Sequence, residues 1–502
     1  MSDSKAILTD ELSRIRYDLE LFLMGGEFDL YEDERLIATV QPDRASAAVS
    51  YGKLILSCWG EDWSRSWRVA GREAAAVGLR LRCAKQMGRS SCLLELTRSK
   101  PQSSPAISRG EFARRLAMLI ESNFAGYRVE RAVAARDDTR HLTGVHARLI
   151  IKHRGKIIAA AGCGQSETQA TVDAALTTGI TWLDTLRKKL RAVDRLVIFA
   201  PRGRAATLAT RLTCVQIAGA TLSLAEVDDA SGRIENVSAF DQGDLADNLK
   251  RAVWPRNQNI PQEISGLIDP ILNLAAADID TDRKGNRVAL SIRGLEFARV
   301  SIKDRRIEFG IETPGKTLTD ANRRELQKLI RACVSERSVD SDRRDGLLYR
   351  SQPERWLETI IRRDVTRIDP TLDPRYAYSQ VPAYRGEHRS FIDLLTATRD
   401  GRLVVMELKV AEDAEFVFQG VDYWLRVEWH RKRGDFERRG YFKGLKIADS
   451  APLLYLVAPL MRFHATTRLV ARAISDRVPV YRIGINEDWR SGVRVLLSEK
   501  LN

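Results

Sequence analysis

Residues 391–410 read FIDLLTATRDGRLVVMELKV, and after a short acidic spacer residues 418–424 read FQGVDYW. Two apolar runs flank the tripeptide Arg-Asp-Gly at positions 399–401, which is a hairpin turn signal. We interpret the stretch after the spacer as a helix that brings a Gln and a Tyr. The stretch therefore predicts a β-hairpin followed by a helix, and the rest of the chain is interpreted from it.

The register of this hairpin decides which side chains share a face. A two-residue loop would set Asp393 opposite Leu408 and turn it away from Glu407. A three-residue loop, with Gly401 in the left-handed conformation, would instead set Asp393 opposite Glu407. Lys409 would then lie on that same face. We expect the second register, because it gathers the charged groups on one face and the apolar ones on the other.

Two facing carboxylates have a chemical consequence. In an apolar sheet Asp393 and Glu407 would repel and raise each other's pKa. A bound Mg²⁺ removes the repulsion, since it takes oxygen ligands and keeps several waters. A water held there beside Lys409 is a candidate nucleophile. The alternative is an ordinary hairpin with its charges in solvent, because a D…ExK pattern also arises by chance.

This constellation resembles the PD-(D/E)xK nuclease superfamily in its RecB-type variant. Asp393 matches the first acid, residues 407–409 match ExK, and residues 419–423 match the QxxxY that follows. Upstream, residues 353–370 read PERWLETIIRRDVTRIDP, an amphipathic helix at the place of the family's acidic helix. One departure is Ile392, where the family name has proline. The resemblance covers roughly residues 353–490.

The resemblance implies a Mg²⁺- or Mn²⁺-dependent DNA endonuclease. Glu358 is the expected helix carboxylate, with Glu354 one turn away as its reserve. The implied metal ligands are Asp393, Glu407, the Leu408 carbonyl and Glu358. Lys409 would position the attacking water, and Gln419 and Tyr423 would orient the lysine or contact the DNA backbone.

Composition agrees with a soluble, multidomain protein. The chain has 502 residues, 44% of them hydrophobic and 29% charged. Its six cysteines form no CxxC pair, which argues against zinc, iron–sulfur and disulfide scaffolds and predicts buried thiols. No apolar run reaches the roughly 18 residues of a spanning helix, so we expect a cytoplasmic protein without a membrane partner. The net charge of +14 favours a polyanionic partner, most simply DNA.

An earlier segment shows the same order of elements: helix, three strands, helix, strand, helix, strand. GITWLDTL at 179–186 matches GVDYWLRV at 420–427, and RLVIFAP at 195–201 matches LLYLVAP at 453–459. This agreement predicts an internal duplication.

Aligning the two hairpins on Gly155 and Gly401 places residues without metal-binding groups at all three positions of the motif. In this threading Ala147, Ala161 and Cys163 take the places of Asp393, Glu407 and Lys409, respectively. The earlier segment is therefore expected to be a degenerate, metal-free copy.

The predicted fold class is α/β (α+β), with a restriction-endonuclease-like αβββαβ core at the C-terminal end. We expect a helix and β-rich domain at 1–98, of barrel or sandwich type, and the degenerate αβ domain at 110–254. A helix with a small β-unit should occupy 261–338, and the nuclease domain 350–502. Trp59, Trp63 and Trp67 in the first domain are expected in its core, with base stacking as the alternative.

A basic segment follows the QxxxY motif, with aromatic residues among its cations. Such a strip beside a metal site suits a phosphodiester substrate, although a solvated helix end is the alternative. There is no phosphate-binding loop of the motor type, so any motor would be a separate subunit, and a homodimer is also open. The rival function is an inactive nucleic-acid-binding scaffold of a larger repair or defence complex. The candidate DNA contacts are Arg426, His430, Arg431, Lys432, Arg433, Arg438 and Arg439.

Overall fold

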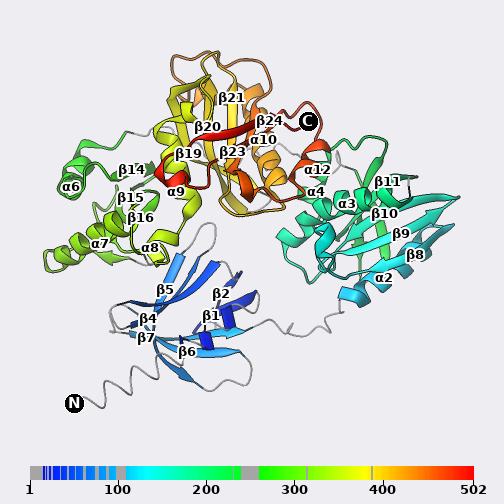
Figure 1. The fold of residues 1–502 in the computed structure, drawn as a ribbon, viewed down its shortest axis with the longest axis horizontal. Coiled ribbons are helices and arrows are strands. Elements are labelled where there is room, and N and C mark those ends of the chain that lie inside the picture. Colours follow the sequence, from blue (N-terminus) through cyan, green and yellow to red (C-terminus); the bar gives the residue numbers. More distant parts are fainter. Residues whose placement is uncertain are drawn as a thin grey trace. The chain divides into compact units, whose positions relative to one another are not determined.

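The chain has a mixed α/β fold, seen here in a computed structural model (Figure 1). Within the described residues the strands form four sheets. Contacts divide the chain into two compact units, residues 1–104 with 258–356, and residues 105–257 with 357–502. The described residues are 15–16, 18–19, 22–23, 27–33, 35–41, 44–50, 53–59, 64–73, 78–85, 90–97, 109–190, 192–229, 231–238, 259–311, 315–385 and 388–502.

The N-terminal segment forms one antiparallel sheet of seven strands in the order β2-β1-β7-β6-β5-β4-β3. Trp67 is buried in its core and its indole nitrogen donates to Glu32 at 3.0 Å, which confirms the core interpretation for this tryptophan. Trp63 lies outside the described residues. The strands are β1 (Phe28–Glu32), β2 (Arg35–Val40), β3 (Ala45–Ser50), β4 (Lys53–Trp59), β5 (Ser64–Glu73), β6 (Leu79–Lys85) and β7 (Ser90–Thr97).

The other part of this unit is a five-stranded antiparallel sheet with two helices packed into a common core. Helix α7 buries Leu326, Ile330 and Cys333, the face that its 3.6-residue period predicts. Its elements are α6 (Gln262–Leu272), β14 (Ile279–Lys284), β15 (Arg287–Ile292), β16 (Leu295–Ser301), β17 (Ile307–Phe309), β18 (Lys316–Thr317), α7 (Arg323–Glu336) and α8 (Leu347–Arg350).

The second unit contains two αβ domains. The first αβ domain, residues 109–238, has a six-stranded sheet between α2 on one face and α3 on the other. It comprises α2 (Arg109–Asn123), β8 (Tyr127–Val133), β9 (Ala147–His153), β10 (Lys156–Gly162), α3 (Gln169–Leu190), β11 (Val193–Pro201), α4 (Ala206–Leu212), β12 (Thr221–Asp228) and β13 (Arg233–Val237).

The second αβ domain, residues 357–502, repeats this arrangement. Helix α10 packs on β21 and β22, as α3 packs on β10 and β11. It comprises most of α9 (Pro353–Arg363), then β19 (Leu372–Arg385), β20 (His388–Thr398), β21 (Leu403–Leu408), α10 (Phe416–Lys432), α11 (Asp435–Arg438), β22 (Leu453–Pro459), α12 (Thr467–Arg472), β23 (Val480–Ile485) and β24 (Val495–Lys500).

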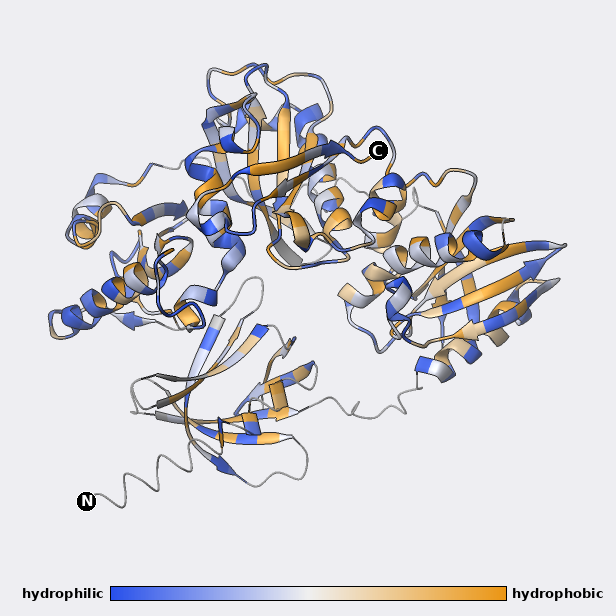
Figure 2. Cartoon of the chain, in the orientation of Figure 1, coloured by the Kyte–Doolittle hydropathy of each residue, from blue (hydrophilic) through white to orange (hydrophobic). Residues whose placement is uncertain are grey.

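The two six-stranded sheets have the same topology. Their orders are β13-β12-β11-β10-β9-β8 and β19-β20-β21-β22-β23-β24. In both, the first three strands are antiparallel, the next two pairings are parallel, and the last is antiparallel. Their central strands are strongly hydrophobic (Figure 2), as strands buried on both faces are, and every residue of β21 and β22 is buried.

All six cysteines are buried and none is in a disulfide, as expected. Across the described helices, none is long and apolar enough to cross a membrane.

Candidate active site

The hairpin β20–β21 adopts the expected three-residue loop. Leu394 pairs with Met406, and at the turn the Thr398 amide donates to the Arg402 carbonyl at 2.8 Å. Gly401 has a φ of 88°, in the left-handed region that glycine adopts without strain. Continued one residue beyond the Leu394–Met406 pair, this register sets Asp393 across from Glu407, so the predicted register is confirmed.

Asp393, Glu407 and Lys409 lie together at the end of this hairpin. The Leu408 amide donates to Asp393 Oδ2 at 2.9 Å, which fixes that carboxylate against the neighbouring strand. Glu407 is buried, with 4% of its surface exposed. Lys409 Nζ lies 3.7 Å from Glu407 Oε1 and 3.5 Å from Asp413 Oδ2. The Lys409 ammonium therefore lies between two carboxylates, that of Glu407 and that of Asp413 four residues further along the chain.

Glu358 reaches this group through a residue that sequence reasoning missed. Gln380 donates from Nε2 to Glu358 Oε2 at 2.7 Å and to Asp393 Oδ1 at 3.3 Å. Ser379 also donates to Glu358, which is buried. Gln380 has a φ of 50°, a strained value for a residue with a side chain, and such strain concentrates at functional sites.

This geometry refines the expected role of the helix carboxylate. Glu358, and not its reserve Glu354, accepts the hydrogen bonds from Ser379 and Gln380 on the strand beside Asp393. Yet the Gln380 amide stands between Glu358 and Asp393. Within the described part of the chain, no three His, Cys, Asp or Glu side chains converge as a metal cluster. Glu358 is thus linked to Asp393 through the Gln380 side chain.

Helix α10 carries Gln419 and Tyr423 one turn apart. The helix lies close to the sheet because Gly420 leaves no side chain there: a Cβ would sit 2.9 Å from Leu454 and 3.0 Å from Leu456. Tyr423 is buried, and Gln419 is partly exposed. The glycine therefore sets the height of the QxxxY residues above the sheet.

The basic strip is smaller than the sequence predicted. Arg426 and His430 are buried, and Arg431 is nearly so, with its guanidinium 2.7 Å from Glu428. These three are corrections, since side chains enclosed by their own domain offer nothing to a polyanion. The cations that remain at the surface are Lys432, Arg433, Arg438 and Arg439.

His430 has a structural role. Its Nδ1 lies 2.7 Å from Asp435 Oδ2. Burial by itself would raise the pKa of Asp435, but His430 and Arg438 outweigh it and hold that pKa below its usual value. The pair closes the corner between α10 and α11.

The interleaved aromatics divide in the same way. Phe436, Tyr441 and Phe442 are buried and pack on one another and on Tyr378, so they belong to the core. Trp429 remains partly exposed, with the Arg433 guanidinium 4.6 Å from its ring centroid. It is the one aromatic of the described strip that keeps a surface for a base.

The first αβ domain has a different residue at the Asp393 position from the one predicted. Its hairpin loop is one residue shorter, because Lys156 pairs directly with His153 around Gly155. Ala161 therefore faces Arg148, not Ala147. The threading of Ala147 onto Asp393 was wrong by one residue, whereas Ala161 keeps the Glu407 position.

Arg148 is buried, and its guanidinium lies 5.7 Å from the Trp182 ring centroid and bonds to the Ala135 carbonyl. A cation thus stands where the second domain has a carboxylate. This site cannot hold a second cation at that position.

No protein-family model and no curated protein matches the chain. Among solved structures, a chain of an EndoMS–dsDNA complex is 13% identical, with a TM-score of 0.18, over 40% of this chain and 84% of that one. A repair endonuclease from Pyrococcus abyssi is 12% identical, also with a TM-score of 0.18, over 43% of this chain and 95% of that one. At these TM-scores neither structure decides what this chain does, and its function rests on the geometry of its own residues.

Proposed function

We propose that the chain is a metal-dependent nuclease of the PD-(D/E)xK type that hydrolyses phosphodiester bonds in DNA. The observation that carries the proposal is the hairpin register, in which Leu394 pairs with Met406 and Asp393 is thereby set across from Glu407, with Lys409 beside Glu407. Burying two carboxylates and an ammonium at one strand end costs folding free energy. Such groups are concentrated at functional sites, which favours a chemical role for them here.

The donor set fits a small divalent cation. Mg²⁺ is commonly held by one or two carboxylates together with waters and substrate phosphate oxygens. Asp393 and Glu407 would supply the carboxylates, and the Leu408 carbonyl a third oxygen. When bound, such an ion supplies a water that deprotonates readily and neutralises charge on the phosphate. The amides of Leu408 and Gln380 would hold the Asp393 carboxylate in position for that ion.

Lys409 would act on the attacking water and on the phosphate. Asp413 on one side and Glu407 on the other fix its ammonium within 3.7 Å of both. From there it can donate to a water or to a phosphate oxygen as negative charge develops. Gln419 and Tyr423 on α10 would orient the lysine or contact the DNA backbone.

The exposed C-terminal end of α10 and helix α11 would bind the DNA backbone. Lys432, Arg433, Arg438 and Arg439 supply cations there, and Trp429 a ring for an unstacked base. The common topology of the two αβ domains supports an internal duplication, after which the first domain exchanged its carboxylates for Arg148 and Ala161.

Cleavage of supercoiled plasmid and single-stranded circular DNA with Mg²⁺ or Mn²⁺ tests the proposal. Wild type should cut, whereas Asp393→Asn and Glu407→Gln should not, with DNA binding retained. Asp449→Asn, which changes a fully exposed carboxylate, is the matched control and should cut normally. Titration with Mn²⁺ followed by electron paramagnetic resonance gives a second readout, in which Glu407→Gln should lose the bound ion.

Each contrary result has its own meaning. Cutting that survives both substitutions contradicts the assignment of the site. Salt-sensitive DNA binding without cutting under either metal would favour the non-catalytic scaffold. A chain that binds neither form of DNA would show that the remaining basic strip does not recognise this polyanion.

A further inference from the structure

The two αβ domains are joined through equivalent segments that follow α4 and α12. These segments run antiparallel and make an isolated bridge with a backbone hydrogen bond on each side. The bridge is Val215 with Ile474, and the bonds are Ser475 N to Cys214 O at 2.8 Å and Gln216 N to Ala473 O at 2.7 Å.

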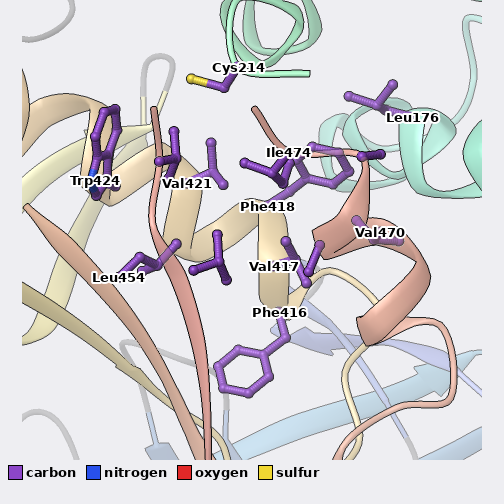
Figure 3. Packing of buried hydrophobic residues seen from close by; sticks show 14 of the residues in the cluster. Leu176, Cys214, Phe416, Val417, Phe418, Val421, Trp424, Leu454, Val470 and Ile474 are labelled. Atoms are coloured by element: carbon purple, nitrogen blue, oxygen red, sulfur yellow. The ribbon is translucent and has the colours of Figure 1, made fainter. Parts of the chain in front are cut away.

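The pairing is reciprocal. Residues 214–216 correspond to 473–475, since the two bonds then become each other's equivalents and the bridge joins equivalent residues. In keeping with this, the Cys214 and Ala473 amides each bond back three residues, to the carbonyls of Arg211 and Val470, respectively. Helix α3 packs on α12, and the equivalent helix α10 packs on α4, so each domain makes the same contact with the other. Figure 3 shows Cys214 and Leu176 of the first domain on the same apolar core as Phe418 and Ile474 of the second. This is how the two subunits of an isologous dimer meet.

One contact breaks the symmetry. Arg211 of α4 is fully buried and binds Asp422 of α10 through two parallel hydrogen bonds of 3.2 and 3.0 Å. A third bond of 2.9 Å reaches Glu415, and the Phe418 ring centroid lies 4.9 Å away. Burial alone would lower the pKa of Arg211, but Asp422 and Glu415 raise it above its usual value, so the arginine stays charged.

The equivalent positions on α12 and α3 carry no such charges. Val470 corresponds to Arg211 by the same match of the two segments. Thr181 corresponds to Asp422, since Gly179 and Gly420 make matching close contacts with their sheets. A second copy of the catalytic domain in place of the first would therefore set Val470 against Asp422 and Glu415. Two enclosed carboxylates would then lose their guanidinium, which is strongly unfavourable.

We propose that the first αβ domain is a built-in, non-cutting partner subunit, which limits the enzyme to one phosphodiester bond per binding event. The proposal rests on the proposed nuclease function of the second domain. Arg211 favours the first αβ domain, over a second copy of the catalytic domain, as the partner of α10. Because the first domain carries Arg148 and Ala161 at the carboxylate positions, the pair of domains has a single cutting centre. Arg211 is also a positioning residue, because α10 carries Gln419 and Tyr423.

The product from supercoiled plasmid tests this. With protein in excess over plasmid, a single centre makes nicked circles first, and linear DNA appears only after a lag. Analytical ultracentrifugation under the same conditions should show a single chain per particle. Linear DNA formed without a lag, or a stable dimer with two cutting centres, overturns the proposal.

The role of Arg211 has its own test. Arg211→Met should lower the cleavage rate by about 10- to 100-fold while DNA binding is retained, because a shift of about 1 Å in a remote support can cost about 100-fold. Arg211→Lys should recover part of the rate. The matched control is Arg204→Met, since the contacts of Arg204 stay within the first domain. Equal rates for wild type and Arg211→Met would refute the positioning role.

Failure of the nuclease function would be recognised separately. A wild-type chain that never cuts contradicts the proposed function, and the pairing is then judged without cleavage. Hydrogen exchange of peptides 206–216 and 467–475 in the single-chain particle decides it. Protection of both supports the built-in partner, and fast exchange of both overturns it.

Discussion

Alanine in place of Gly401 should damage the second αβ domain far more than the same change at Gly155 in the first. Both glycines sit in hairpin loops at positive φ, 88° and 76°. They differ in their surroundings. A Cβ at Gly155 meets nothing within 4 Å, whereas a Cβ at Gly401 would lie 1.9 Å from the Lys446 carbonyl oxygen.

The magnitudes follow from these two environments. A left-handed alanine costs about 1–2 kcal/mol, and the stiffer unfolded chain returns about 0.4–1 kcal/mol. Gly155→Ala should therefore destabilise by about 1 kcal/mol. For Gly401→Ala the backbone near Lys446 must retreat, which adds about 1–3 kcal/mol for overpacking. The hydrogen bond from the Ala448 amide to the Gly401 carbonyl, 2.9 Å long, is then also at risk, at about 1 kcal/mol. The total is about 3–5 kcal/mol.

Hydrogen exchange read by peptide measures the two hairpins in the same molecule. Peptides of β20 and β21 should lose most of their protection in Gly401→Ala, and peptides of β9 and β10 should lose little in Gly155→Ala. Cleavage should fall only in the first variant, since its hairpin sets Asp393 against Glu407. Equal losses of protection in the two variants would refute the reasoning, because φ alone would then account for both.

Three further predictions concern single features of the site and its surroundings. Gln380→Gly should change the stability by less than about 1 kcal/mol, because relief of strain offsets the lost hydrogen bonds, yet lower kcat/KM; unchanged cleavage would exclude Gln380 from the site. Burial lowers the pKa of His146 from 6.5, so below about pH 6.5 the unfolded chain binds a proton that the folded chain does not. The free energy of unfolding should therefore be full above about pH 6.5 and fall below it. The melting temperature of His146→Gln should depend less on pH than that of wild type, and a wild-type melting temperature that does not change with pH would contradict this. Arg433→Ala and Arg438→Ala should each lower the slope of log affinity against log salt by about 1; no change in slope would place DNA elsewhere.

The hairpin register could be predicted from sequence because the side-chain period of a strand is two. Only one register gathers Asp393, Glu407 and Lys409 on a face, and a turn with Gly401 supplies it. The same reasoning failed in the first domain for a physical reason. Matching the two loop glycines assumes equal loop lengths, and one residue fewer moves Arg148 into the place given to Ala147.

Other parts of the site depend on long-range contacts that no local pattern contains. Gln380 has no neighbouring motif, and its role comes from standing opposite Asp393 beside a helix some twenty residues earlier. The basic strip misled for a related reason. A count of cations does not show that His430 faces Asp435 or that Arg431 faces Glu428, and these acids lie within the same strip.

Burial and chemistry divide the charges of the second unit in a consistent way. Arg211 and Asp422 are enclosed completely, bind each other in parallel and have no route to a substrate, so their charge fixes which domain lies beside α10. Lys409 keeps 14% of its side chain exposed and meets its carboxylates at 3.5 and 3.7 Å, beyond direct hydrogen-bond length. In the proposed function, a lysine that meets its acids only at these longer distances can exchange one of them for a phosphate, whereas an arginine with two parallel hydrogen bonds to its partner cannot. Under the two proposals, Arg211 of α4 would therefore determine which domain lies beside α10, and Lys409, directly after β21, would act on the substrate.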